Sequence, residues 1–369
     1  MDEFIDLWID VSSSLRQLCS QFDGRWQKRA RIINSAFLVT AILKMVWSKN
    51  TEGYGSNLAT FWKDGLSLGV ILRKKTPISA SSFCEARAKL SEEFFRELNY
   101  SITKKYETDR VKTSHSIERR FFAVDGSIID LPRSLVQFGY ELRSEKSYYP
   151  QGLLSCLYNL ENGIPYDFIL DAHRNERFSA RQHLKLLSNN DVVVYDRGYF
   201  SYAMLYFHNK ASVGAIFRLR TNKNFPEIQN FIDSDQTDEI VTVYPEHPVT
   251  RKDILKVNPD VSIISIKLRL TKAVIEGKPY YFGTTLTKAE ITTQQIENIY
   301  AKRWSIEELY KTTKCLIGIE DFHSKTERGV KQEIYAGLLL ITMSRVIANQ
   351  AEVTMNVENK NQKKKGARA

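Results

Sequence analysis

The sequence predicts an α/β protein in which a mixed sheet is flanked by helices. Three successive patterns along the 369 residues lead to this prediction. Apolar residues recur at helical spacing over residues 1–115, short apolar runs alternate with helical stretches over 116–220, and proline-rich alternating runs fill 221–287. We therefore expect an all-helical N-terminal domain, the first part of a core, an all-β insertion, the second part of the core over 288–350, and a basic disordered tail over 351–369.

Residues 1–115 are predicted to hold four helices. The first is marked by Ile5, Trp8, Ile9, Leu15 and Leu18, and the next two cover Ile32–Trp47 and Leu58–Leu72. Ser82-x-x-Glu85 is typical of a capping box and is expected to open a helix that ends near Asn99. From these residues alone the region is either a structural domain or a helical module that grips DNA.

The core is predicted from short apolar runs that turn signals separate. Arg119–Asp125 ends in an acid, and a second run, Ile128–Leu131, follows Gly126 and Ser127. The remaining predicted elements are a hairpin of Gly152–Leu160 and Ile164–Leu170 across Glu161-Asn162-Gly163, a helix Glu176–Leu187, a strand Asp191–Tyr195, a helix Tyr202–His208 and a strand Val213–Leu219. This order of strands and helices is that of an RNase H-like core.

The insertion and the C-terminal part complete the predicted chain. Five of the nine prolines lie in the insertion: Pro226, Pro245, Pro248, Pro259 and Pro279. Its alternating runs predict the strands Ile240–Tyr244, Val261–Leu270 and Tyr280–Thr285. A mostly apolar helix is expected over Glu333–Asn349, before the polar segment Asn359–Ala369, whose lysines would attract phosphates without specificity.

Composition narrows the class of protein. A formal net charge of +10 and a pI near 9.2 favour an anionic partner such as nucleic acid. Cys19, Cys84, Cys156 and Cys315 are scattered without metal-ligand spacing, which argues against disulfides and structural zinc. The Met-Asp-Glu start lacks the basic residues of a signal peptide, and the apolar runs are predicted to be too short to span a bilayer. We expect a reduced, cytoplasmic location without a membrane partner.

One helix, predicted over Tyr300–Lys314, gathers charge on a narrow face. At 100° per residue, Tyr300, Arg303, Glu307, Lys311 and Lys314 all fall within one stripe. Such cations bind phosphates, and the lone carboxylate can hold a divalent metal. The alternative is a solvated helix face with ion pairs between residues four apart.

Two further carboxylates follow predicted strands. Asp125 ends the first apolar run and Asp196 follows Asp191–Tyr195, 71 residues later (196 − 125). We expect both to converge with Glu307, because the predicted strands are neighbours and the helix packs near their ends. Three acids without histidine or cysteine suit two Mg²⁺ or Mn²⁺ ions, which serve phosphoryl transfer. The alternative is that each aspartate caps a strand or a turn.

These motifs together resemble a known family. Tyr300, Arg303, Glu307 and Lys314 match a Tyr-x-x-Arg-x-x-x-Glu-x-x-x-x-x-x-Lys signature. It resembles that of DDE transposases of the insertion-sequence-four family, which serve bacterial cut-and-paste elements. Asp125 in VDGSIIDLP and Asp196 in YDRGYF resemble the family's first two catalytic aspartates. The resemblance implies that Asp125, Asp196 and Glu307 are catalytic and bind two Mg²⁺ (or Mn²⁺) ions. It also implies that Tyr300, Arg303 and Lys314 position DNA phosphates, a role that the charged stripe extends to Lys311.

The resemblance also implies a reaction. Water attacks the end of the element, the freed 3′-hydroxyl attacks the opposite strand to form a hairpin, and the reopened end joins target DNA. Residues 1–115 would read the terminal inverted repeats, and two protomers would bring two ends together at the bacterial nucleoid. The family's base-stacking tryptophan has no counterpart in the insertion, since the five tryptophans are Trp8, Trp26, Trp47, Trp62 and Trp304. Either Phe225, Tyr244 or Tyr280 replaces it, or hairpin formation differs. The alternatives are a catalytically silent, domesticated, sequence-specific DNA-binding protein and a nuclease that cuts without joining.

Overall fold

The N-terminal region is helical, as the periodicity predicts. The computed structural model describes residues 2–26, 32–48, 52–70, 74–113, 119–222, 225–245 and 265–366, with isolated positions between 252 and 259. Its first helices are α1 (Asp2–Trp26), α2 (Ser35–Ser48), α3 (Tyr54–Ser67), α4 (Ala80–Arg87) and α5 (Glu93–Thr113).

The predicted capping box is wrong. Ser79, not Ser82, caps α4, since its side chain accepts a hydrogen bond from the Ser82 amide at 3.2 Å. The chain then turns, and the Ser91 hydroxyl accepts from the Glu93 amide at the start of α5. The single helix that was predicted between Ser82 and Asn99 is therefore divided between Arg87 and Glu93, just where Ser91 lies.

One mixed sheet runs through the rest of the protein. Its strands are β1 (Arg120–Asp130), β2 (Glu141–Leu142), β3 (Pro150–Asn159), β4 (Ile164–Asp171), β5 (Asp191–Tyr195), β6 (Gly214–Arg218), β7 (Asp238–Val243), β8 (Ile266–Ile275) and β9 (Lys278–Thr284). The order is β2-β3-β1-β5-β6-β9-β8-β7, and β4 pairs with β3. Because β1, β5 and β6 are parallel while β3 and β4 are antiparallel to their neighbours, the centre of the sheet has the predicted RNase H-like order.

Two strand predictions need correction. The first two apolar runs are one strand, because Gly126 and Ser127 continue the ladder with Ser155 and Leu154 of β3. The insertion is not all-β, since it contains α8 (Pro226–Ile232), and its strands extend the main sheet through the pairing of β9 with β6. The first residues of the predicted strand Val261–Leu270 lie outside the described part of the chain.

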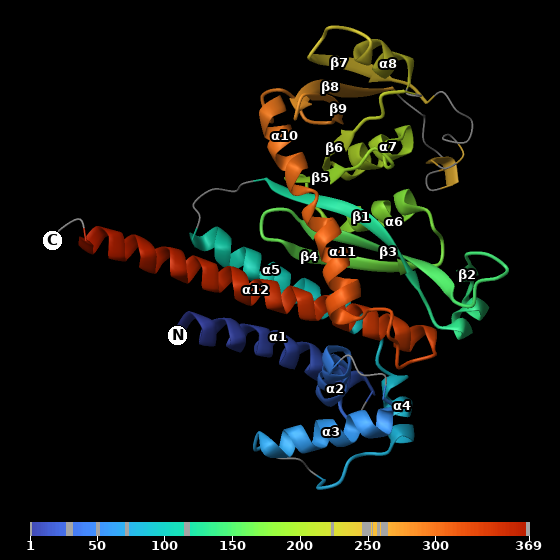
Figure 1. Ribbon diagram of the computed structural model, residues 1–369, viewed down its shortest axis with the longest axis vertical. Helices are drawn as coiled ribbons and strands as arrows, with labels where there is room; N and C mark the ends of the chain where they lie inside the picture. The colour runs from blue at the N-terminus through green and yellow to red at the C-terminus, as the bar shows by residue number, and fades with distance from the viewer. Residues whose placement is uncertain are drawn as a thin grey trace.

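Helices cover both faces of the sheet (Figure 1). Side chains of β1 alternate: Phe122 and Val124 pack with α6 (Glu176–His183) and α7 (Tyr202–Ala211), whereas Ala123 belongs to the core on the other face. On that other face α12 (Glu327–Gly366) lies beside α5 and α1 and packs on β4. The N-terminal helices and the C-terminal helix thus share one core with the sheet.

The C-terminal helix is longer than expected. It continues to Gly366, so the prediction of disorder from residue 351 is wrong over the described residues 351–366. No proline interrupts the helix, and it ends at a glycine. Glu327–Val353 is long and apolar enough to cross a membrane by length and composition, contrary to the prediction. Half of its most apolar window is buried inside the protein, as in a core helix.

The predicted signature helix is in fact two helices, α10 (Thr293–Lys302) and α11 (Ser305–Thr312), followed by a π-helical turn, Thr313–Ile317. The backbone tightens between them, because the amides of Arg303 and Glu307 bond to carbonyls only three residues back, at 3.0 Å each. The helical face predicted from uniform rotation is therefore interrupted at its centre.

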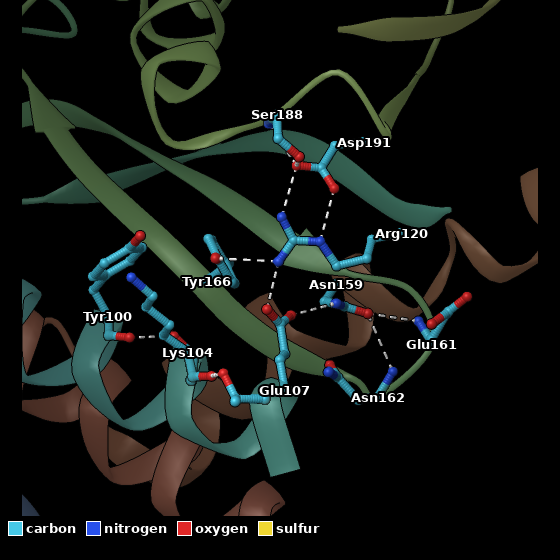
Figure 2. A network of polar contacts seen from close by, with 12 residues as sticks. Tyr100, Lys104, Glu107, Arg120, Asn159, Glu161, Asn162, Tyr166, Ser188 and Asp191 are labelled. Carbon is cyan, nitrogen blue, oxygen red and sulfur yellow. Dashed lines mark hydrogen bonds and ion pairs between the residues drawn. The ribbon is translucent and has the colours of Figure 1, made fainter. Parts of the chain in front are cut away.

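A partly buried polar network aligns the two central strands (Figure 2). Arg120, at the start of β1, donates through Nε and Nη2 to both carboxylate oxygens of Asp191, at the start of β5, each at 2.7 Å. Asp191 is fully buried and also accepts from the Ser188 amide and hydroxyl. Arg120 further contacts Glu107 of α5. Because both strands begin at one bidentate ion pair, their register is set at that end.

Candidate active site

The register of β1 and β5 brings the first two acids to one level. The strands pair from Arg120–Asp191 to Ala123–Val194, and the numbers of paired residues differ by 71 (191 − 120). Asp125 and Asp196 differ by the same 71, two positions beyond the last pair. Asp196 follows β5 as predicted. Asp125 does not end a strand, because β1 continues along β3 to Asp130.

The third acid reaches this edge on α11. Glu307 lies in the first turn of that helix. The buried hydroxyl of Tyr310 lies 2.8 Å from the Asp125 carbonyl oxygen and 2.9 Å from that of Leu154. This contact fixes α11 across β1 and β3, so Glu307 is positioned relative to Asp125 by a neighbouring side chain on its own helix.

Arg303 stands between two of the acids. Its Nη2 donates to Glu307 Oε1 at 2.9 Å, and its Nη1 lies 3.7 Å from Asp125 Oδ2. The side chain is 5 % exposed, and its Nε has no hydrogen-bond partner among the described residues. A buried guanidinium therefore occupies the place where the predicted site would hold a cation.

Asp196 has a separate set of partners. The hydroxyl of Tyr300, on α10, donates to Asp196 Oδ1 at 3.1 Å, and Arg218 Nη1 lies 3.8 Å from the same oxygen. Arg218 also stacks over the Tyr280 ring at 4.6 Å. Sequence reasoning missed Arg218, although it ends β6, which is parallel to β5 and so reaches the same edge of the sheet.

The electrostatics show that the acids interact. Burial raises the pKa of Asp125, and the nearby carboxylates of Glu307 and Asp196 raise it further, against the lowering effect of the Gly126 amide and Arg303. Partial desolvation also raises the pKa of Glu176, with Asp125 and Asp196 adding to the effect. Glu176 was not predicted; the available signal was an acid directly after the helix-capping Asn175.

The two predicted lysines lie farther along α11 and the π-helical turn. Lys311 is 69 % exposed and pairs with Glu308 at 2.6 Å, so it does not join Glu307 and Arg303. Lys314 Nζ donates to the Ile128 carbonyl at 2.7 Å and lies 4.0 Å from Glu320. The structure thus places Lys314 along β1, three residues beyond Asp125.

Within the described residues, no group of three or more His, Cys, Asp or Glu side chains lies close enough to hold a metal ion. Arg303 lies between two of the predicted acids, Asp125 and Glu307. The donor chemistry nevertheless fits Mg²⁺ or Mn²⁺, because the acids offer only oxygen and a cation already stands between Asp125 and Glu307.

Comparison with known proteins identifies the family. The family model described as "Transposase DDE domain" matches residues 116–343, which span the sheet, both helices of the signature and the start of α12.

The chain belongs to the DDE transposase family.

A curated relative is the putative transposase for insertion sequence element IS4SA of Synechocystis sp., 22% identical over 292 residues, covering 77% of this chain and 76% of the relative. This DDE transposase is therefore of the insertion-sequence-four type that the signature predicts. Among solved structures, the piggyBac transposase synaptic complex with hairpin DNA is similar at a TM-score of 0.40 and 11% identity. The match covers 94% of this chain and 73% of that one.

Proposed function

We propose that this DDE transposase cleaves DNA at the ends of an insertion sequence and joins the freed 3′ ends to target DNA. The observation that carries the proposal is the convergence of Asp125, Asp196 and Glu307 at one edge of the sheet, with Arg303 and Tyr300 among them. Two Mg²⁺ or Mn²⁺ ions held by the three acids would supply activation of the attacking oxygen and stabilisation of the leaving one.

Residues of the signature position the DNA in this proposal. Arg303 moves from the carboxylates to a terminal phosphate, for which its planar guanidinium is well suited. Tyr300 holds Asp196 in place through its hydroxyl. Lys314 donates to a protein carbonyl farther along β1, that of Ile128. Lys311, exposed on α11, adds a phosphate contact at the rim.

The proposed reaction passes through a hairpin on the DNA end. Of the three aromatic residues considered for base stacking, Tyr280 supports this step best, because Arg218 links its ring to Asp196. Phe225 packs on Phe200 at a centroid distance of 6.0 Å, and Tyr244 is exposed beyond the end of β7.

The proposed partners are the element's terminal inverted repeats and target DNA. Residues 1–115 read the repeats, and a homodimer holds two ends together in the synaptic complex. The net charge of +10 supports binding to a polyanion. The proposed location is the bacterial cytoplasm at the nucleoid.

The test compares Glu307→Gln with Glu308→Gln on a labelled duplex that carries the element's own terminal repeat, with Mg²⁺. Both variants remove one carboxylate from adjacent positions of α11, but Glu308 points outward and pairs with Lys311. We expect Glu307→Gln to lose end cleavage by a factor of at least about 10³ while binding DNA normally, and Glu308→Gln to cleave like the wild type. Cleavage by Glu307→Gln would overturn the proposal, and binding without cleavage by the wild type would favour a silent DNA-binding protein.

A further inference from the structure

A fourth carboxylate approaches the catalytic edge from the side opposite α11. Glu176 is the first residue of α6, which the Asn175 side chain caps by accepting from the Phe178 amide at 3.3 Å. A Cβ built on Gly126 would lie 3.3 Å from Glu176 Cγ and 3.4 Å from its Oε1. Gly126 directly follows Asp125, so the Glu176 carboxylate lies against the backbone next to the first catalytic acid.

The absence of a side chain at position 126 leaves room for this approach. Asp125 faces α11, where Arg303 and Glu307 contact it or lie near it, and the next residue along the strand faces α6. The described pairing of β1 with β5 ends before Asp125, at Ala123–Val194. Carboxylates on opposite faces of the sheet therefore meet where the two strands are no longer paired.

A second observation comes from Tyr199. Its ring is buried, and its hydroxyl faces the Glu176 carboxylate as a hydrogen-bond donor. Burial, followed by the charges of Glu176 and Asp125, raises the pKa of this hydroxyl, so it stays a protonated donor. A buried donor that orients a carboxylate is the kind of outer-shell partner that metal-ligating carboxylates have.

The charges of the site are unbalanced. Asp125, Asp196, Glu307 and Glu176 contribute four carboxylates, whereas among the described residues Arg303 and Arg218 are the cations at ion-pair distance from the first three. Arg177 lowers the pKa of Glu176 but donates its hydrogen bonds to the Gly198 carbonyl, at 3.0 and 2.8 Å. The excess of negative charge is what a site for divalent cations requires.

We propose that Glu176 is a fourth metal-binding carboxylate of this site, acting together with Asp125 and Asp196. The proposal rests on the function proposed above and adds one ligand to the acids that the signature identifies. Glu176 is solvent-accessible at the start of a helix, so it can take up a cation without rearrangement of the core.

The experiment measures Mn²⁺ binding to the full chain without DNA, by calorimetric titration and by the shift in melting temperature that Mn²⁺ produces. Glu176→Gln keeps the shape of the side chain, and Glu308→Gln is the matched control. We expect Glu176→Gln to weaken Mn²⁺ binding at least about tenfold and to reduce the melting-temperature shift, as Asp125→Asn does, while the control is unchanged. Without Mn²⁺, Glu176→Gln should melt at or above the wild-type temperature, because one of several repelling carboxylates is gone.

Two outcomes would overturn the proposal: Mn²⁺ affinity of Glu176→Gln within twofold of the wild type while Asp125→Asn is weakened, or no Mn²⁺ binding by the wild-type protein. Glu176→Asp separates a ligand from a packing role, since a shortened carboxylate should recover part of the affinity that the amide loses. The function proposed above fails by a different measurement, the cleavage of DNA by Glu307→Gln, so the two failures are distinguishable.

Discussion

Replacing Arg303 by methionine tests whether a guanidinium takes the place of a metal ion. The change removes the charge and keeps most of the apolar volume. Arg303 is buried, and its acid partners Glu307 and Asp125 are 35 % and 22 % exposed, so solvent screens the pair only in part. The charged hydrogen bond to Glu307 contributes about 1.5–3 kcal/mol, and the loss of the ion contact to Asp125 adds to it. We expect the free energy of unfolding to fall by about 2–4 kcal/mol at pH 7 without metal.

The assay is urea unfolding with EDTA and again with Mn²⁺. Because Arg303 competes with a cation for Glu307 and Asp125, Mn²⁺ should stabilise Arg303→Met by more than it stabilises the wild type, although the variant loses DNA cleavage. Lys311→Met is the control, since Lys311 is exposed and pairs with Glu308, and it should leave both measurements unchanged. The reasoning is refuted if Mn²⁺ stabilises Arg303→Met and the wild type equally, or if the two variants lose the same free energy.

Two further predictions concern stability. Arg87→Met should lower the free energy of unfolding by about 3–5 kcal/mol, because Glu333, 5 % exposed and 2.9 Å away, is left as a buried charge. Lys44→Met breaks an exposed pair and should lower it by at most about 1 kcal/mol in the same urea titration. Equal losses in the two variants would contradict this prediction. Burial holds the pKa of His208 at about 4, below the 6.5 of an unfolded histidine, so the unfolded state binds more protons and stability falls as the pH drops from about 6.5 to 4. The loss should reach roughly 3 kcal/mol, and His208→Gln should flatten that part of the pH profile; an unchanged slope would rule out His208 as its cause.

Local signals predicted the parts of the fold that neighbouring residues determine. The hairpin is where Glu161-Asn162-Gly163 indicates it, because Gly163 adopts a φ of +68° and Asn159 accepts from the amides of Glu161 and Asn162. The run Asp191–Tyr195 is a buried strand, and its short length and β-branched residues exclude a helix. Asp196 could be placed at the edge of the sheet for the same reason.

The other predictions were wrong or incomplete because they depended on contacts between segments that are distant in sequence. Nothing near Asp125 in sequence shows that β1 continues, because the partner that extends it is β3. A uniform helical wheel predicted that Lys311 joins Glu307, but Glu307 pairs with Arg303 and Lys311 pairs with Glu308. Glu176 and Arg218 reach the site only through the packing of α6 and the pairing of β6, which no local motif encodes.

The bidentate pair of Arg120 and Asp191 makes the spacing between position 120 and Asp125 intolerant of insertions and deletions. Since side chains of a strand alternate between faces, loss of one residue there would turn Asp125 away from α11, and loss of two would restore its face but displace it by about 7 Å. The loop that follows β2 carries no such constraint, because residues 143–149 lie between strand pairings. Copies of this gene that differ in length within β1 should therefore fold poorly or be inactive. Copies that differ in length within residues 143–149 should keep Asp125 and Asp196 side by side at the edge of the sheet.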